Sequence, residues 1–229
     1  MPKLVVAALV LLPALARADV VDRSPAGFTV KTVVTIAASP ERTFRAFVDD
    51  IGRWWDPAHT LSGDAGNLRV TANPGGCFCE TLKNSGGVAH AVVNNVIPGE
   101  MIRMTGALGP LQETATTGTL TWQFTPSGQG TTATVTYSVG GYFPGGFEKI
   151  AGPVDQVIGD QIRRLKAYLE RPASAQAPSA RTRAITNIRG DLYRVQDANH
   201  YTVFLVTPAG IILGDPINTQ AATWLKAEL

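Results

Sequence analysis

The strongest periodic pattern in the chain lies in residues 153–170. Apolar side chains recur there at intervals of three and four, on the side opposite most of the charges: Val154, Val157, Ile158, Ile162, Leu165, Tyr168 and Leu169. This spacing predicts a helix with one apolar face. Pro153 suits the first position of a helix, and Arg163 and Lys166 lie toward the other end, as the helix dipole favours. A face this apolar needs a partner.

Strand-like segments precede that helix and can supply the partner. Residues 28–36 are rich in β-branched side chains, and Ser39-Pro40-Glu41 then has the chemistry of a helix start. Short turns rich in Gly, Pro, Asn and Ser, and one long loop at residues 107–117, separate five further strand candidates, residues 77–82, 88–97, 101–106, 118–125 and 131–139. Because the turns are short, the strands that they join should pair antiparallel.

Strict alternation in the last two strands indicates which side faces the core. Leu120, Trp122 and Phe124 share one face of their strand. Ala133, Val135, Tyr137 and Val139 share one face of the next, while the intervening residues are polar. One apolar and one polar face fit a sheet that covers a single long helix. The pattern therefore predicts an α+β fold, an antiparallel meander wrapped around a long C-terminal helix.

The amino terminus has the layout of a secretory signal peptide. Lys3 precedes an apolar run at residues 4–12, and Ala16-Arg17-Ala18 offers an A-x-A cleavage site. We therefore expect residues 1–18 to be removed, residues 19–27 to be a short lead, and the protein to be exported to the periplasm or secreted. No stable membrane span should remain after this removal, although an uncleaved anchor or interfacial helix is an alternative.

Charge and composition narrow the class of partner. Cleavage after residue 18 removes two of the 20 basic residues and leaves 18 against 18 acidic ones. A neutral protein lacks the basic surplus of a nucleic-acid-binding protein. We expect no nucleic-acid partner and no cofactor, and the oligomeric state stays open.

A Pro-, Ala- and Ser-rich stretch, residues 171–183, divides the chain and predicts a linker. Beyond it, residues 184–229 show four short strand patterns and a final helix beginning at residue 219. So short a segment has little material for a core of its own.

The most distinctive cluster of reactive residues comprises Cys77, Cys79 and His90. On a regular strand the Cα atoms of residues 77 and 79 would lie about 6.5 to 7 Å apart, the upper limit for a disulfide, so we expect none. Thiolates and an imidazole suit zinc or copper(I), with His59 or Glu80 as a further ligand. The alternative, that both cysteines are small apolar fillers, is the one we expect, so we predict no bound metal.

Other candidates point to a pocket or to proton transfer. Trp54, Trp55 and His59 could form the rim of a pocket or simply pack, and Tyr137 and Tyr142 could offer hydroxyl groups to a ligand or be satisfied within the protein. Glu80 and His90 are candidates for a catalytic base, because an apolar cavity needs only one or two placed polar groups for such chemistry.

Several sequence segments together resemble the helix-grip fold of the START-like (SRPBCC) superfamily. They are VVTIAASPERTFRAFVD, WW, PGGCFCE, VIPGEMIRMTGALG, LTWQFTP, GTTATVTYSVGGY and VIGDQIRRLKAYLE, within residues 28–170. The chain looks closest to the polyketide-cyclase-like branch, which includes the chaperone-ATPase-activator domain. The resemblance implies a hydrophobic cavity between sheet and C-terminal helix, lined here by residues such as Trp122, Ile158 and Ile162.

Residues 184–229 carry a different resemblance. The stretch GDLYRVQDANHYTVFLVTPAGIILGDP is similar to the opening strands of a metallo-β-lactamase-fold domain. The H-x-H-x-D-H motif that binds zinc in such domains is missing from this sequence, so we expect no hydrolase activity from the segment. The chain could also be the N-terminal part of a larger zinc hydrolase.

The leading hypothesis is therefore an exported domain that binds a small hydrophobic molecule. A cyclase-like or lyase-like enzyme using the same cavity, and a protein-interaction module, are the alternatives. The residue patterns leave open whether any reaction is catalysed.

Overall fold

The computed structural model describes residues 17–128, 130–172, 183–197, 200–217 and 219–229. The chain divides into two compact units, Met1–Pro172 and Ala173–Leu229, and each is described by itself. Within the described residues, every helix is too short or too polar to cross a membrane.

The N-terminal unit is built on one eight-stranded antiparallel sheet with the order β1-β2-β8-β7-β6-β5-β4-β3. Its strands are β1 Arg17–Ser24, β2 Gly27–Ile36, β3 Leu68–Val70, β4 Cys77–Thr81, β5 Gly87–Ile97, β6 Met101–Thr105, β7 Ala115–Ser127 and β8 Gly130–Tyr142. From β4 to β8 each strand pairs with the next in sequence, which is the predicted meander.

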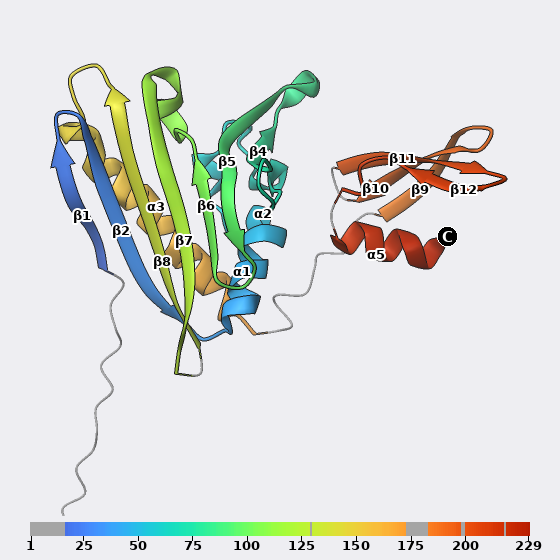
Figure 1. Ribbon diagram of the computed structural model, residues 1–229, viewed down its shortest axis with the longest axis horizontal. Coiled ribbons are helices and arrows are strands. Elements are labelled where there is room, and N and C mark those ends of the chain that lie inside the picture. The colour runs from blue at the N-terminus through green and yellow to red at the C-terminus, as the bar shows by residue number, and fades with distance from the viewer. Residues whose placement is uncertain (1–16, 129, 173–182, 198–199, 218) are drawn as a thin grey trace, which may run out of the picture. The chain divides into compact units, whose positions relative to one another are not determined.

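Helices cover one face of this sheet (Figure 1). They are α1 Pro40–Asp49, α2 Ile51–Trp54 and the long α3 Glu148–Leu169, and the connections contain the short 3₁₀ turns η1 Pro57–His59, η2 Ala65–Asn67, η3 Lys83–Ser85 and η4 Gly109–Glu113. Helix α3 packs on β2, β1 and β8. Ser39 caps α1 as predicted, since its side chain accepts a hydrogen bond from the amide of Arg42. The α+β arrangement of a meander and one long helix is confirmed.

The predicted core face is also the buried one. Leu120, Trp122 and Phe124 of β7 are at most 1% exposed, and the inward residues of β8 are at most 5% exposed. The apolar stripe of α3 belongs to the same core, with Ile162 and Leu165 completely buried. Alternation along the strands and three-to-four spacing along the helix thus meet in one core.

Helix α3 begins at Glu148 and contains Pro153, whereas the sequence pattern placed Pro153 at the first position. Phe147, which precedes the helix, is fully buried and packs its ring against Phe28 at 5.8 Å and Phe143 at 5.6 Å between centroids. This anchor fixes an earlier start. Pro153 has no N–H, so the carbonyl of Lys149 loses its helical donor.

Strand β1 occupies residues that are predicted to be signal peptide and lead. It pairs antiparallel with β2 at the edge of the sheet, with Ala18 opposite Thr32 and Ser24 opposite Gly27. The pairing register shifts between Val20 and Asp22, so inward and outward residues do not alternate regularly along β1. The sequence therefore shows no two-residue period that would predict this strand. The predicted cleavage site after Ala18 therefore lies inside a paired strand.

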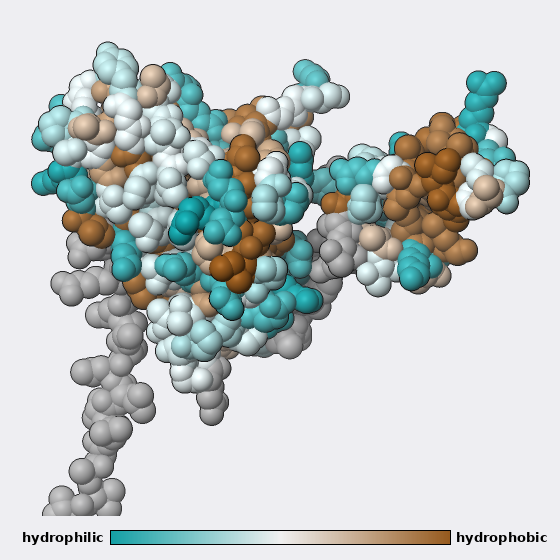
Figure 2. Space-filling view, in the orientation of Figure 1, coloured by the Kyte–Doolittle hydropathy of each residue, from teal (hydrophilic) through white to brown (hydrophobic). Residues whose placement is uncertain are grey.

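The C-terminal unit is a four-stranded antiparallel sheet with one helix. Its elements are β9 Arg183–Arg189, β10 Leu192–Asp197, β11 His200–Thr207, β12 Gly210–Leu213 and α5 Thr219–Glu228, and the strand order is β12-β11-β10-β9. Val195, Phe204 and Leu225 form its small core. Figure 2 shows hydrophobic surface on this unit, where Tyr201, Val203, Leu205, Ile211 and Ile212 are exposed.

Candidate functional site

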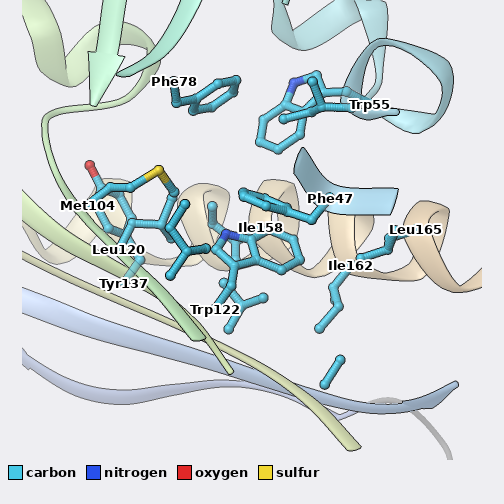
Figure 3. Close-up of a cluster of buried hydrophobic side chains, with 14 of the residues drawn as sticks. Phe47, Trp55, Phe78, Met104, Leu120, Trp122, Tyr137, Ile158, Ile162 and Leu165 are labelled. Atoms are coloured by element: carbon cyan, nitrogen blue, oxygen red, sulfur yellow. The ribbon is translucent and has the colours of Figure 1, made fainter. Parts of the chain in front are cut away.

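The interior between the sheet and α3 is filled by large side chains (Figure 3). Trp122 lies within this cluster, with its ring 4.7 Å from that of Phe47, and α3 contributes Ile158 and Ile162. Trp122, Tyr137 and Ile162 are 0% exposed, and Ile158 is 2% exposed. A ligand-sized void would leave accessible surface on its lining. The expected open cavity is therefore absent beside these described side chains, which pack closely as core residues do.

Trp122 carries one of the buried polar atoms that lack a partner among the described residues; Thr32 Oγ1 and Gln161 Nε2 are others. Trp54 donates its indole N–H to the carbonyl of Ala46 at 2.9 Å, and Trp55 donates to the carbonyl of His59 at 3.1 Å. The Nε1–H of Trp122 is buried and has no acceptor among the described residues. A buried donor left unpaired costs about 1 to 3 kcal/mol, so Trp122 is a specific polar feature in an apolar interior.

Tyr137 uses its hydroxyl to hold a neighbouring segment. The hydroxyl donates to the carbonyl of Gly106 at 3.1 Å and accepts from the amide of Leu108 at 3.0 Å. Burial raises the pKa of Tyr137 to about 12, although the hydrogen bond from Leu108 opposes this effect. This tyrosine is thus satisfied within the protein. Tyr142, the other candidate hydroxyl, is 68% exposed at the end of β8.

Glu80 and His90 form a buried pair between β4 and β5. His90 Nε2 lies 2.9 Å from Glu80 Oε2, and the two residues are 7% and 1% exposed. The pairing depends on a β-bulge: Phe78 lies opposite Ala91, but the next residue, Cys79, lies opposite Ala89. His90 is therefore the extra residue of β5. With Ala91 facing inward, regular alternation would turn His90 outward, and the bulge turns it inward.

Hydrogen-bond donors keep Glu80 ionised. The amides of Leu61 and Ser62 donate to its two oxygens, and the first bond measures 3.0 Å. Burial by itself would raise the pKa of Glu80, but hydrogen bonding from the Ser62 side chain, from these two amides and from His90 together lowers the pKa below its ordinary value. An ionised carboxylate only accepts, so His90 Nε2 donates to it.

The opposite ring nitrogen of His90 is then an acceptor. Gln112 Nε2 lies 3.4 Å from His90 Nδ1, and a basic nitrogen oriented by a buried carboxylate can take a proton from a bound molecule. Gln112 lies in η4, within the segment 106–114 that Tyr137 holds from its other end. This segment runs close to β5, since a Cβ on Gly106 would lie 2.2 Å from the carbonyl oxygen of His90.

The two cysteines do not form a metal site. Cys77 and Cys79 are joined by a disulfide, and their Cα atoms are 5.4 Å apart. The expectation of no disulfide is wrong because it assumed a regular strand, whereas β4 is shortened opposite the bulge at His90. An oxidised pair offers no thiolate, so Cys77 and Cys79 cannot join His90 as metal ligands while the disulfide is formed.

The remaining predicted site residues lie elsewhere. Trp54 and Trp55 are buried but line one wall of a surface pocket of about 320 Å³, together with Arg53 and Arg164. The side chain of His59 is exposed on η1. The structure thus brings Trp122, Tyr137, Ile158 and Ile162 into one interior and leaves His59 and Tyr142 at the surface. Sequence reasoning missed Gln112 and the two backbone donors to Glu80, because no local pattern marks them.

A family model described as "Polyketide cyclase / dehydrase and lipid transport" matches residues 27–170. The chain belongs to this family. This family match confirms the START-like resemblance. The matched residues include the predicted ligand-binding and catalytic candidates. It ends before the C-terminal unit, and the predicted metallo-β-lactamase resemblance of that unit finds no support in the comparisons.

Solved structures similar to this family member come from several bacteria. The Mll3558 protein from Rhizobium loti is 23% identical, with 61% of this chain and 94% of that chain covered and a TM-score of 0.46. An uncharacterized protein from Rhizobium leguminosarum is 21% identical, with 69% and 100% covered and a TM-score of 0.47. CalU16 from Micromonospora echinospora is 11% identical, with 71% and 90% covered and a TM-score of 0.47. No curated protein matches.

Proposed function

We propose that residues 27–170 bind a small apolar molecule carrying a hydrogen-bond acceptor, in the interior between β7, β8 and α3. The observation that carries this proposal is the unpartnered Nε1–H of Trp122 within an otherwise apolar cluster. A ketone, ester or carboxyl oxygen placed there would satisfy the donor. Membership of a family described by polyketide chemistry and lipid transport supports a ligand of this class.

The energetics favour a molecule that is mainly apolar. Each Å² of apolar ligand surface removed from water contributes roughly 25 cal/mol, and a single well-placed hydrogen bond adds about 1 kcal/mol. The hydrogen bond would therefore select and orient the ligand, while burial supplies most of the affinity.

Because the interior is closed, part of the protein must move to admit a ligand. The segment 106–114 is the natural candidate: it inserts Leu111, which is completely buried, but it is not a strand and is held at one end by Tyr137. Loops with few backbone bonds open more readily than strands. Withdrawal of Leu111 would vacate apolar volume next to the sheet.

Export remains part of this proposal. The basic, apolar and small-residue layout of residues 1–18 supports it. Fractionation of a producing bacterium should recover the mature chain, beginning at Asp19, outside the cytoplasm. Recovery of the full-length chain in the cytoplasm alone would contradict export and leave the binding proposal untouched.

Trp122→Phe tests the binding proposal. Purified protein is screened against long-chain fatty acids, steroid ketones and aromatic polyketides, and a ligand at 100 times its Kd should raise Tm by about 5 to 10 °C. Trp122→Phe keeps the apolar ring and removes the donor, so affinity for a ketone should fall about fivefold to tenfold. Isothermal titration measures the loss.

Two controls sharpen this test. Trp224→Phe, in the C-terminal unit, should leave the affinity unchanged. A hydrocarbon that matches the ketone but lacks its oxygen should bind wild type and Trp122→Phe alike. Failure of every ligand to raise Tm, together with native mass spectra that show only the bare chain, would contradict the proposal.

Tyr137→Phe tests the entry route. Removing the hydroxyl eliminates the bonds to Gly106 and Leu108, and we expect the free energy of unfolding to fall by about 1 to 2 kcal/mol. The segment 106–114 should then open more often, so the association rate of the ligand in stopped-flow measurements should rise. Tyr142→Phe, at an exposed site, should change neither quantity. A slower or unchanged association rate in Tyr137→Phe would place the entrance elsewhere.

The buried pair of Glu80 and His90 favours a second candidate function, proton abstraction in a cyclase-like or lyase-like reaction. His90 Nδ1 would be the base and Glu80 would orient the ring. Solvent deuterium should enter a bound ketone next to its carbonyl in wild type but not in His90→Gln. Equal exchange in both proteins would exclude His90 as the base.

A further inference from the structure

The Cys77–Cys79 disulfide lies directly opposite the bulge that turns His90 inward. Cys77 pairs with Val92 and Cys79 with Ala89, so the bonded pair brackets the position at which β5 carries its extra residue. Their Cα separation of 5.4 Å is shorter than the roughly 6.5 to 7 Å of a regular strand. One strand is shortened where its neighbour is lengthened, and the two distortions fit each other.

A purely stabilising role explains this disulfide poorly. Cross-links stabilise mainly by restricting the unfolded chain, and the effect is least for the shortest loops. Only Phe78 separates the two cysteines, so the bond restricts almost nothing that the peptide chain does not already restrict. What the bond does constrain is the local geometry of β4 from Cys77 to Cys79, which positions the neighbouring residues Phe78 and Glu80.

Both of these neighbours contact His90. Glu80 holds its Nε2 at 2.9 Å, and the ring of Phe78 lies 5.0 Å from the imidazole ring between centroids. Any change in the path of β4 at residues 77–79 therefore acts on the two side chains that fix the imidazole. The disulfide is thus connected to the proposed base through Phe78, which lies between the two cysteines, and through Glu80, which follows Cys79.

We infer that the Cys77–Cys79 disulfide is a redox-responsive element that keeps His90 in its inward position. Cys77 is the more accessible of the two cysteines, since it is half-buried while Cys79 is 8% exposed. The thiolate of a dithiol attacks Sγ of Cys77, the Sγ–Sγ bond breaks, and Cys79 leaves as a thiolate that takes up a proton. The second thiolate of the reductant then displaces Cys77. The reductant becomes a disulfide and the protein gains two electrons and two protons.

Reduction releases the constraint on β4. The Cα atoms of residues 77 and 79 can then move apart toward the spacing of a regular strand, and β5 no longer faces a shortened partner. The bulge at His90 then no longer faces a shortened stretch of β4. β5 can pair with β4 in a different register, in which the side chain of His90 turns outward. This inference concerns the position of the imidazole and holds whether or not the interior accepts a ligand.

The three histidines of the chain provide a direct test. Isotope-labelled full-length protein is examined by NMR before and after treatment with dithiothreitol under native conditions, while a thiol reagent counts free thiols. Two thiols should appear per chain, and the imidazole resonances of His90 should shift while those of His59 and His200 stay in place. Amide exchange at residues 89–91 should accelerate by about tenfold or more, with no change at Leu120.

Variants locate the effect. The Cys77→Ser, Cys79→Ser protein should show the reduced-type spectrum of His90 without reductant and should not respond to dithiothreitol. Should this variant fail to fold, the oxidised and reduced wild-type proteins still decide the matter. Two outcomes overturn the inference: a disulfide that resists reduction until the whole unit unfolds, or complete reduction with unchanged resonances of His90.

Discussion

Replacing Ile162 by alanine should lower the free energy of unfolding of the N-terminal unit by about 2 to 5 kcal/mol. Ile162 is completely buried on the face of α3 that meets the sheet. Its removal takes away the transfer free energy of the lost methyl and methylene groups and leaves a void among side chains that cannot all collapse into it. Urea unfolding, followed by indole fluorescence in a Trp224→Phe background, reports on this unit.

Ile97→Ala is the matched control. Ile97 lies in β5 of the same unit and is 43% exposed, so its truncation should cost no more than about 0.5 kcal/mol. The contrast isolates burial from the chemistry of the substitution. Equal losses in both variants would mean that α3 is not packed on the sheet as described, which would remove the basis of the proposed binding interior.

Glu80→Gln should destabilise the unit by about 3 kcal/mol at neutral pH, because it replaces a buried carboxylate that accepts charge-assisted hydrogen bonds. Leu61 and Ser62 would each lose an ionised acceptor, and His90 would lose the carboxylate that orients it. Urea unfolding gives the loss, and a shift of the His90 imidazole resonances shows whether the ring has moved.

The pH dependence of this effect has a definite sign. The pKa of Glu80 is lower in the folded protein than its ordinary value of 4.5, so the folded state favours the ionised form. The stabilisation is complete above the unfolded pKa and is lost as the pH falls through the lower folded pKa. The difference in stability between wild type and Glu80→Gln should therefore be constant above about pH 5 and shrink in more acidic solution.

Glu100→Gln, at an exposed position of the same unit, should show almost no difference at any pH. A difference between wild type and Glu80→Gln that grew on acidification would contradict the ionised state assigned to Glu80.

The sequence predicted the structure well where apolar residues recur at every second position of a strand or at every third or fourth position of a helix. Leu120, Trp122 and Phe124 alternate with polar residues and do face the core, and the apolar stripe of α3 is buried in the same core. Such patterns identify a face because burial of apolar surface outweighs local preferences. They do not tell whether the space between two apolar faces is open or filled, and here the size of Trp122 and its neighbours fills it.

The sequence did not predict the structure where a single residue interrupts the alternation of inward and outward side chains along a strand. Ala91 and Val93 face inward, so the pattern alone would place His90 on the outer face. The bulge depends on the pairing of β4 with β5. That pairing follows a turn in which Asn84 and Ser85 both have positive φ. The same irregularity shortened β4 and made a disulfide possible, which regular strand geometry had argued against.

Strand β1 adds a condition on the order of events during maturation. The peptide bond after Ala18 lies between residues that pair with Thr32 and Lys31 of β2. A protease needs its target segment free of other partners, and a paired strand offers this only when it opens. If processing occurs where the amino terminus predicts, it must happen before the sheet closes, so that translocation and removal of the leader precede folding.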